Sequence, residues 1–106
     1  PDFDLELFVN KGQKATLENT ILILPAAIDI LNGVQPWKSE TLFENLKKLG
    51  ADLGLKAGSV MWAVRIAISG TSATPGGATD ILEILGKVES LRRLTASLEK
   101  VKAAVG

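Results

Sequence analysis

The chain has 106 residues, of which 46% are hydrophobic, a length and composition that suit a single domain with its own core. Twelve basic and twelve acidic residues cancel, so nothing resembles the basic stripe of a protein that grips any duplex, and any binding to nucleic acid has to be selective. Cysteine and histidine are both absent, which excludes disulfides, cysteine nucleophiles, histidine triads and the usual zinc sites.

The sequence contains no targeting or membrane signal. No apolar run approaches the roughly 20 residues that a membrane-spanning helix needs. The first residues, PDFDLELF, lack the positive charge and the small-residue cleavage site of a signal peptide, so we expect a cytoplasmic protein. The chain begins at Pro1 without methionine and ends in ordinary helix formers, so we expect it to be an excised fragment.

The first expected helix opens near Thr16, after an irregular acidic start. Apolar residues then recur at spacings of four and three up to Leu31, which is the stripe of an amphipathic helix. Pro25 interrupts the stripe, because proline removes a backbone donor and crowds the carbonyl four residues back. The helix is therefore expected either to kink or to split at Pro25, and to stop at Gly33.

The second expected helix has Ser39 as its cap and Gly54 as its stop, since serine is favoured at helix starts and glycine takes the left-handed conformation cheaply. Gly50 lies inside this helix and costs it some stability. The apolar stripe of the helix consists of Leu42, Phe43, Leu46, Leu49 and Leu53.

Residues 58–70, GSVMWAVRIAISG, are apolar on almost every side. A solitary strand would leave its backbone groups unsatisfied, and no convincing partner strand exists, so we expect a central buried helix. A loop at residues 70–77, a short helix at 78–85 closed by Gly86 and a longer helix towards the C-terminus follow. The pattern predicts an all-α fold, a compact bundle of about five helices.

Arg65 is the sharpest chemical signal, because a buried guanidinium without a partner costs several kcal/mol. A structural partner could be Asp52, Asp80, Glu83 or backbone carbonyls at a helix end, and the residues alone favour this interpretation. Alternatively, the planar fork of Arg65 reaches a ligand, since guanidinium matches phosphates and base edges in a bidentate way.

The loop that follows is rich in glycine and small hydroxyl residues, and composition alone makes it a simple connection. Its functional interpretation is that Gly76 and Gly77 let a ligand approach bare backbone, that Pro75 offers a rigid face, and that amides of the next helix point outward. The lysine and serine of a phosphate-cradling loop are missing.

The two tryptophans could stack on bases for roughly 1–3 kcal/mol each, but tryptophan at helical spacing is more often a core residue. We expect Trp62 to lie in the core with an exposed edge, and Trp37 to act as a hydrophobic lid. Lys87, Arg92 and Arg93 follow Gly86, where cations oppose the dipole of the last helix. A solvated face is the default for them, and phosphate contact is the alternative.

Residues 53–94, LGLKAGSVMWAVRIAISGTSATPGGATDILEILGKVESLRRL, resemble the C-terminal part of bacterial glutamyl-tRNA synthetases. In that family a helix with Met, Pro and Arg ends in a small-residue turn, and a Thr-Pro-Gly or Ser-Pro-Gly loop precedes a helix that opens with LGK and contains RRL. This chain has Ala63 at the proline position, so we expect a softer bend. The matching residues are Met61, Arg65, Gly70, Thr74, Pro75, Gly76, Leu85, Gly86, Lys87, Arg93 and Leu94.

The resemblance extends upstream to PDFDLELF and to Trp37 with ETLFENLKKLGADLGLK, and so covers nearly the whole chain. It implies the C-terminal half of the anticodon-binding helical cage of a class I synthetase, with residues 1–12 as a lead-in segment and residues 13–106 as the C-terminal anticodon-binding helical subdomain. The parent enzyme of this family attaches glutamate to tRNA(Glu) in an ATP-dependent two-step reaction.

The catalytic residues of the family are not expected in this chain. Its ATP signatures need a histidine and a Lys-Met-Ser-Lys-like loop, whereas the chain has no histidine and its sole methionine is Met61. We therefore expect no catalytic residue, no cofactor and no metal in the chain. By resemblance, ATP and Mg belong to the catalytic domain of the parent enzyme.

The resemblance assigns tRNA binding to one helix end and one loop. Arg65 would hydrogen-bond or order one anticodon nucleotide, and the loop would read another. The implied partners are the anticodon loop of tRNA(Glu) and the remainder of the synthetase chain, without membrane or DNA, in a monomer. The residues assigned to tRNA are Arg65, Thr74, Pro75, Gly76 and Gly77, with Lys87 and Arg93 as phosphate contacts.

Two other functions are compatible with the residues. One is a helical protein-interaction module without RNA binding, with an apolar groove lined by Trp37 and Phe43, which the net neutrality supports. The other is the anticodon domain of another class I synthetase, such as the glutaminyl or the lysyl enzyme of that class.

Overall fold

A computed structural model describes residues 4–71, 74 and 76–105 of the chain. The described residues form an all-α fold in which two short 3₁₀ helices, η1 (Leu5–Phe8) and η2 (Lys11–Gln13), precede five α-helices. The expected fold class and number of helices are therefore confirmed. The α-helices are α1 (Leu17–Asn32), α2 (Ser39–Leu53), α3 (Ala57–Ser69), α4 (Ala78–Leu85) and α5 (Lys87–Val105).

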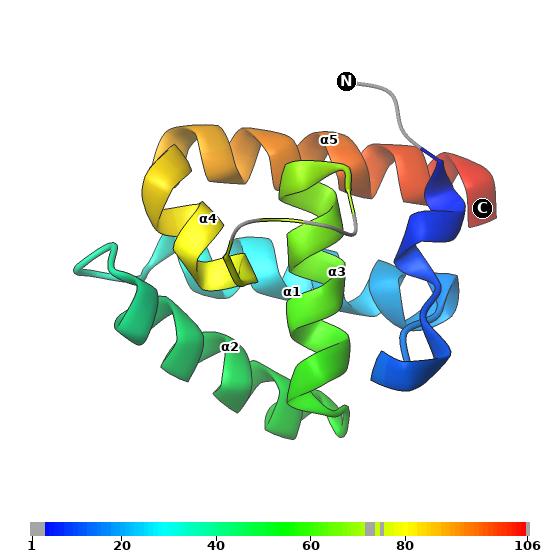
Figure 1. The fold of residues 1–106 in the computed structure, drawn as a ribbon, viewed down its shortest axis with the longest axis horizontal. Coiled ribbons are helices and arrows are strands. Elements are labelled where there is room, and N and C mark those ends of the chain that lie inside the picture. The colour runs from blue at the N-terminus through cyan, green and yellow to red at the C-terminus, as the bar shows by residue number, and fades with distance from the viewer. Residues whose placement is uncertain (1–3, 72–73, 75, 106) are drawn as a thin grey trace.

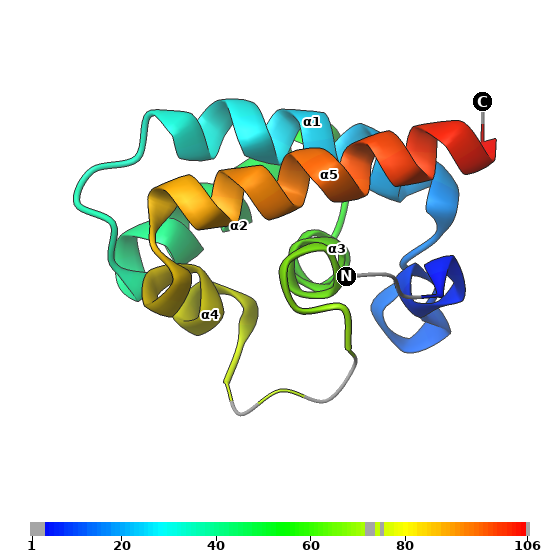
Figure 2. The same ribbon diagram turned by 90° about the horizontal axis from the view of Figure 1, so that it is seen from above.

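Helix α3 is the centre of the molecule, which measures 33 × 30 × 24 Å. Helices α1 and α5 lie side by side along the long axis of the molecule, and α3 runs across both of them (Figure 1 and Figure 2). Helices α2 and α4 pack on one side of α3 and the two 3₁₀ helices on the other. The expectation of a central buried helix is thus confirmed.

Helix α1 runs without interruption through Pro25, so the expected alternative of two separate pieces is wrong. Thr16 starts the helix as expected, because its hydroxyl accepts from the Asn19 amide at 3.0 Å and the Asn19 side chain accepts from the Thr16 amide at 2.9 Å. Pro25 is exposed. The carbonyl that loses its helical donor there can be hydrated, which lowers the cost of the proline.

Helix α2 starts differently from the sequence expectation. Its N-cap is Lys38, and Ser39 is the first helical residue, so the assignment of Ser39 as the cap is wrong. The missing local cap is replaced from α4, because the Ser39 amide donates to the Glu83 carboxylate at 2.6 Å and its hydroxyl donates to Asp80 at 2.9 Å. Carboxylates at a helix N-terminus are favourable, and this pair joins α2 to α4.

The N-terminal segment packs onto the helices rather than standing apart from them. The Phe8 side chain is fully buried in the main core. The Trp62 indole nitrogen donates to the Leu7 carbonyl at 2.9 Å, and the Ser59 hydroxyl donates to the Gln13 carbonyl at 2.6 Å. Residues that precede α1 therefore belong to the packing of α3, while the division at residue 12 stays a prediction.

Glycine ends three of the described helices, α2, α3 and α4, in backbone conformations that other residues avoid. Gly54 ends α2 at φ 72°, as expected, and Gly86 joins α4 to α5 at φ 83°. The backbone turns at Gly86 directly from one helix into the next, which sets the angle between α4 and α5.

Replacing Gly86 with alanine should lower the free energy of unfolding by on the order of 1–2 kcal/mol, because an L-residue is strained at positive φ. Gly33→Ala is the matched control, since Gly33 has φ −101° and a Cβ there would lie 3.8 Å from its nearest neighbour, the Ile30 carbonyl oxygen. Urea denaturation of both variants measures the difference. An equal loss in both would contradict the assignment of strain to Gly86.

Candidate functional site

One stripe of α3 remains partly open to solvent. Most of the helix is buried by its neighbours, but Gly58, Met61, Trp62 and Arg65 are only half-buried. Their spacing of three and four residues places them on the same face of the helix. This face forms one wall of a groove of about 700 Å³ between α2, α3 and the start of α4.

The groove combines apolar surface with negative charge. Phe43 of α2 faces Met61 and Trp62 of α3 across it, and the Phe43 side chain is 42% exposed. Glu40 and Glu44 add two carboxylates from α2. The other residues that line the groove are Gln13, Ser39, Gly58, Arg65, Gly77, Ala78, Thr79 and Asp80.

Arg65 is held in the groove wall by groups without charge. Its Nε donates to the Thr74 hydroxyl at 2.9 Å, and its guanidinium carbon lies 5.8 Å from the centre of the Trp62 ring. A cation over an aromatic face at this distance is attracted by the ring. The two Nη groups of Arg65 make no hydrogen bond to any residue that the structure describes.

The carboxylates that the sequence offered as partners of Arg65 do not bind it within the described ranges. Asp80 accepts from the Gly77 amide and the Ser39 hydroxyl, and Glu83 accepts from the Ser39 amide. The interpretation of Arg65 as the partner of an internal carboxylate is therefore wrong for the described part of the chain, because the nearby carboxylates cap helices instead.

The helix end and the loop are joined through Thr74. Its hydroxyl accepts from Arg65 and donates to the Gly76 carbonyl at 2.5 Å. Three of the residues assigned to tRNA thus lie together at one edge of the groove. Pro75, between them in sequence, lies outside the described residues.

Gly77 does not present a bare amide to the groove. Its amide donates to the Asp80 carboxylate at 3.1 Å, and its carbonyl accepts from the Ile81 amide at 3.2 Å. The Gly77 amide is therefore occupied within the chain, while the expectations that a ligand approaches the Gly77 backbone and that amides of the following helix point outward stay predictions. A carboxylate three residues into α4 takes the place that an anion would occupy.

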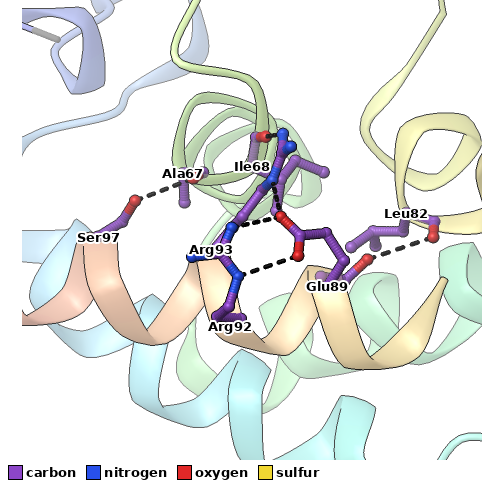
Figure 3. A network of polar contacts seen from close by, with 8 residues as sticks. Ala67, Ile68, Leu82, Glu89, Arg92, Arg93 and Ser97 are labelled. Atoms are coloured by element: carbon purple, nitrogen blue, oxygen red, sulfur yellow. Dashed lines mark hydrogen bonds and ion pairs between the residues drawn. The ribbon is translucent and has the colours of Figure 1, made fainter. Parts of the chain in front are cut away.

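Lys87 and Arg93 do not line the groove. Lys87 is exposed at the start of α5. Arg93 reaches from α5 to the end of α3, where its Nη1 donates to the Ile68 carbonyl at 2.8 Å and its Nε donates to Glu89 at 2.6 Å (Figure 3). The expected conflict of Arg93 with the dipole of its own helix is thus offset, because its charge lies at the favourable C-terminal end of α3.

Glu89 accepts from two arginines on the same helix, Arg92 and Arg93, each at 2.6 Å. The hydrogen bond from Arg92, and then that from Arg93, lowers the pKa of Glu89 from 4.5 to about 2. The folded state therefore holds the Glu89 carboxylate in its charged form more strongly than the unfolded chain does.

The lowered pKa of Glu89 predicts a pH dependence of stability. Because the pKa of Glu89 is lower in the folded state, its bonds to the two arginines stabilise the fold fully above pH 4.5. This contribution to the free energy of unfolding is lost as the pH falls through about 2. The difference in Tm between the natural chain and Glu89→Gln should be constant above pH 4.5 and should shrink below it. A difference that persists unchanged at pH 2 would contradict this ion-pair geometry.

The tryptophans lie in different places. Trp62 is half-buried and lines the groove, so the expectation of a core residue with an exposed edge is confirmed. Trp37 is also half-buried, but its indole donates to the Leu82 carbonyl at 2.7 Å and it does not line the groove. The pairing of Trp37 with Phe43 in one groove is therefore wrong.

The sequence did not predict that α2 and α3 form facing walls of one groove. The spacing of Met61, Trp62 and Arg65 was the available signal, because positions three and four apart on a helix share a face. The position of Phe43 opposite them had no such signal, since it depends on how two helices pack.

Comparisons with a family model, with curated relatives and with solved structures show which proteins this chain resembles. A family model described as "Anticodon binding domain" matches residues 1–98. The chain therefore belongs to the anticodon binding domain family.

None of the helices in the described part of the chain is long and apolar enough to cross a membrane.

Curated relatives narrow the similarity to glutamate–tRNA ligases. The chain is 39% identical over 102 residues to the glutamate–tRNA ligase of Clostridium tetani, and the match covers 96% of this chain and 21% of the relative. It is 38% identical over 105 residues to that of Clostridium novyi, covering 99% of this chain and 22% of the relative. The resemblance expected from the sequence is thus confirmed, and the chain spans about a fifth of the length of these relatives.

A solved structure shares the fold. It is the crystal structure of a glutamate tRNA ligase from Elizabethkingia meningosepticum in complex with its amino acid, with a TM-score of 0.79 and 23% identity. The match covers 94% of this chain and 19% of that one. At this identity the match supports the arrangement of the helices alone.

Proposed function

We propose that this chain is the part of a glutamate–tRNA ligase that binds the anticodon loop of tRNA(Glu), and that the groove beside Arg65 receives an anticodon nucleotide. The observation behind this proposal is the set of hydrogen bonds that the Arg65 side chain makes. Its Nε is fixed by Thr74, while its Nη groups bind no described residue at the edge of the groove. Such a fork is already oriented for a ligand that accepts two hydrogen bonds.

The charge of the groove favours a base over a phosphate. Glu40, Glu44 and Asp80 line the groove with one guanidinium, so a phosphate would meet more repulsion than attraction. An unpaired base has no net charge and offers both donors and acceptors at its edge. Its face would pack on the apolar surface of Met61, Trp62 and Phe43, as unstacked bases do on aromatic side chains.

The loop would form the second contact. Thr74 and Gly76 lie at the edge of the groove beside Arg65, and Gly77 lines it. Pro75 belongs to the same stretch and is proposed on resemblance alone. Lys87, exposed at the start of α5, is proposed to contact a phosphate.

The proposal extends to the parent enzyme through its relatives. That enzyme would attach glutamate to tRNA(Glu) as a monomer in the cytoplasm, and ATP and Mg would bind in its catalytic domain rather than in this chain. A helical protein-interaction module without RNA binding is not favoured, because the family match covers residues 1–98.

Binding of a fluorescent anticodon stem-loop of tRNA(Glu) tests the proposal. At fixed salt, the chain should bind this stem-loop about tenfold or more tightly than one with the same stem and a replaced anticodon, since a bidentate contact to a base discriminates by about 1–3 kcal/mol. Equal affinity for the two stem-loops would mean that the chain does not read the anticodon.

A further inference from the structure

The end of α3 is held by α5 through side chains. The last carbonyls of a helix have no donor within the helix, and they need partners from elsewhere. The Ser97 hydroxyl donates to the Ala67 carbonyl at 2.9 Å, and Arg93 Nη1 donates to the Ile68 carbonyl at 2.8 Å (Figure 3). Two successive carbonyls of the last turn of α3 are therefore bound by α5.

Arg93 is itself held on both edges of its guanidinium. Its Nε donates to Glu89 at 2.6 Å while its Nη1 binds Ile68, and its side chain is only 33% exposed. Glu89 lies one turn before Arg93 on α5, so the ion pair fixes the direction in which Arg93 leaves the helix (Figure 3). A point-charged lysine could bind one of these two acceptors but not both in this geometry.

The turn that Arg93 holds is also hydrogen-bonded to the backbone of Arg65. The Ser69 hydroxyl donates to the Arg65 carbonyl at 2.6 Å and to the Thr71 carbonyl at 3.0 Å. The Arg65 side chain is in turn bound to Thr74, on the far side of the same loop. A displacement of the last turn of α3 would therefore move both the backbone of Arg65 and the loop that orients its side chain.

We propose that Arg93 is a positioning residue, which acts from α5 through the last turn of α3 to set the direction of the Arg65 fork in the groove. Arg93 does not line the groove, so this role needs no contact with a ligand. Its effect on RNA affinity rests on the proposed function, whereas its effect on Arg65 is measurable in the protein without RNA.

The test compares Arg93→Ala with Arg92→Ala in the whole chain. Arg92 binds the same Glu89 and has the same charge, but it has no contact with α3 among its hydrogen bonds in the described structure, which makes it the matched control. The NMR resonance of the Arg65 Nε–H, identified by its loss in Arg65→Lys, reports the bond to Thr74. Affinity for the anticodon stem-loop is measured well below the Tm of every variant.

Arg93→Ala should shift or broaden the Arg65 Nε–H resonance and weaken stem-loop binding about threefold to thirtyfold, the range typical of energetic coupling through packed elements. Arg92→Ala should change neither, and Arg93→Lys should restore only part of each. If Arg93→Ala does not fold, Ser97→Ala replaces it, and a smaller shift of the same resonance is expected because the bond to Ala67 is lost.

An Arg93→Ala variant with a lower Tm but an unchanged Arg65 resonance and unchanged affinity would overturn the proposal, since Arg93 would then be purely structural. If the natural chain does not bind the stem-loop, the proposed function fails. The positioning role is then judged from the protein without RNA. A shift of the Arg65 Nε–H resonance in Arg93→Ala would support it, and an unchanged resonance would overturn it.

Discussion

Replacing Arg65 with alanine should weaken binding of the tRNA(Glu) anticodon stem-loop about 10- to 100-fold, the loss expected for one bidentate contact to a base. The fold should remain, because the Arg65 side chain contacts the Thr74 hydroxyl and the face of Trp62 and makes no ion pair within the described structure. Titration of each variant with the labelled stem-loop measures the affinity. Circular dichroism at the same temperature measures the retained helix.

Two further variants separate the shape of Arg65 from its charge. Arg65→Lys keeps the charge but loses the planar fork, so it should bind almost as weakly as Arg65→Ala. Arg92→Ala removes the same charge from an exposed site outside the groove and should bind as the natural chain does. Equal losses for Arg92→Ala and Arg65→Ala would show that only net charge matters and would contradict a base-reading role.

Replacing Phe8 with alanine should lower the free energy of unfolding by about 3–5 kcal/mol, the cost of removing a large aromatic side chain from a packed core. Phe8 is fully buried in the main core, although it precedes every α-helix in the sequence. Urea denaturation followed by circular dichroism measures the change. Against a typical domain stability of about 5–15 kcal/mol, this is a large fraction of the total.

Val9→Ala is the matched control, because Val9 follows Phe8 directly and its side chain is 48% exposed. It should change the stability by about 0.5 kcal/mol or less, as exposed substitutions usually do. A small effect of Phe8→Ala, similar to that of Val9→Ala, would mean that the lead-in segment does not contribute to the folded core.

The helices could be predicted from the sequence because their signals are local. The apolar run around Val64 and Ile66 predicted a buried helix, and both side chains are fully buried in α3, although one stripe of that helix stays partly open. Thr16 and Gly54 mark helix ends by the chemistry of their own positions. Pro25 was harder, because the packing of α1 outweighs its local preference to break a helix.

The errors concern bonds between residues far apart in the chain. Ser39 was expected to cap its own helix, but Asp80 and Glu83 of α4 bind it instead. Arg93 was expected on a solvated face by default, but it binds the end of α3, while its expected contact with a phosphate stays a prediction. These contacts depend on how the helices pack against one another, which the periodicity of a single helix does not determine.

The candidate site was therefore only half accessible to sequence reasoning. Arg65 stood out as a cation in an apolar run, and a loop rich in glycine followed it. The sequence did not show which group binds Arg65. Asp80, one of the carboxylates considered, binds the Ser39 hydroxyl at the start of α2 and the Gly77 amide at the start of α4 instead. The acidic and apolar walls of the groove became visible only when α2 was placed opposite α3.

The central claim is that the groove beside Arg65 receives an anticodon nucleotide, and an NMR titration tests it most directly. The isotope-labelled chain is titrated with the tRNA(Glu) anticodon stem-loop, and the backbone, indole and guanidinium N–H signals are followed. The account predicts the largest shifts at the groove, above all at Met61, the Trp62 indole, the Arg65 Nε–H and Gly76. Shifts confined to exposed cations of α5, or to the exposed face of α1 around Leu22, with none at the groove, would contradict it.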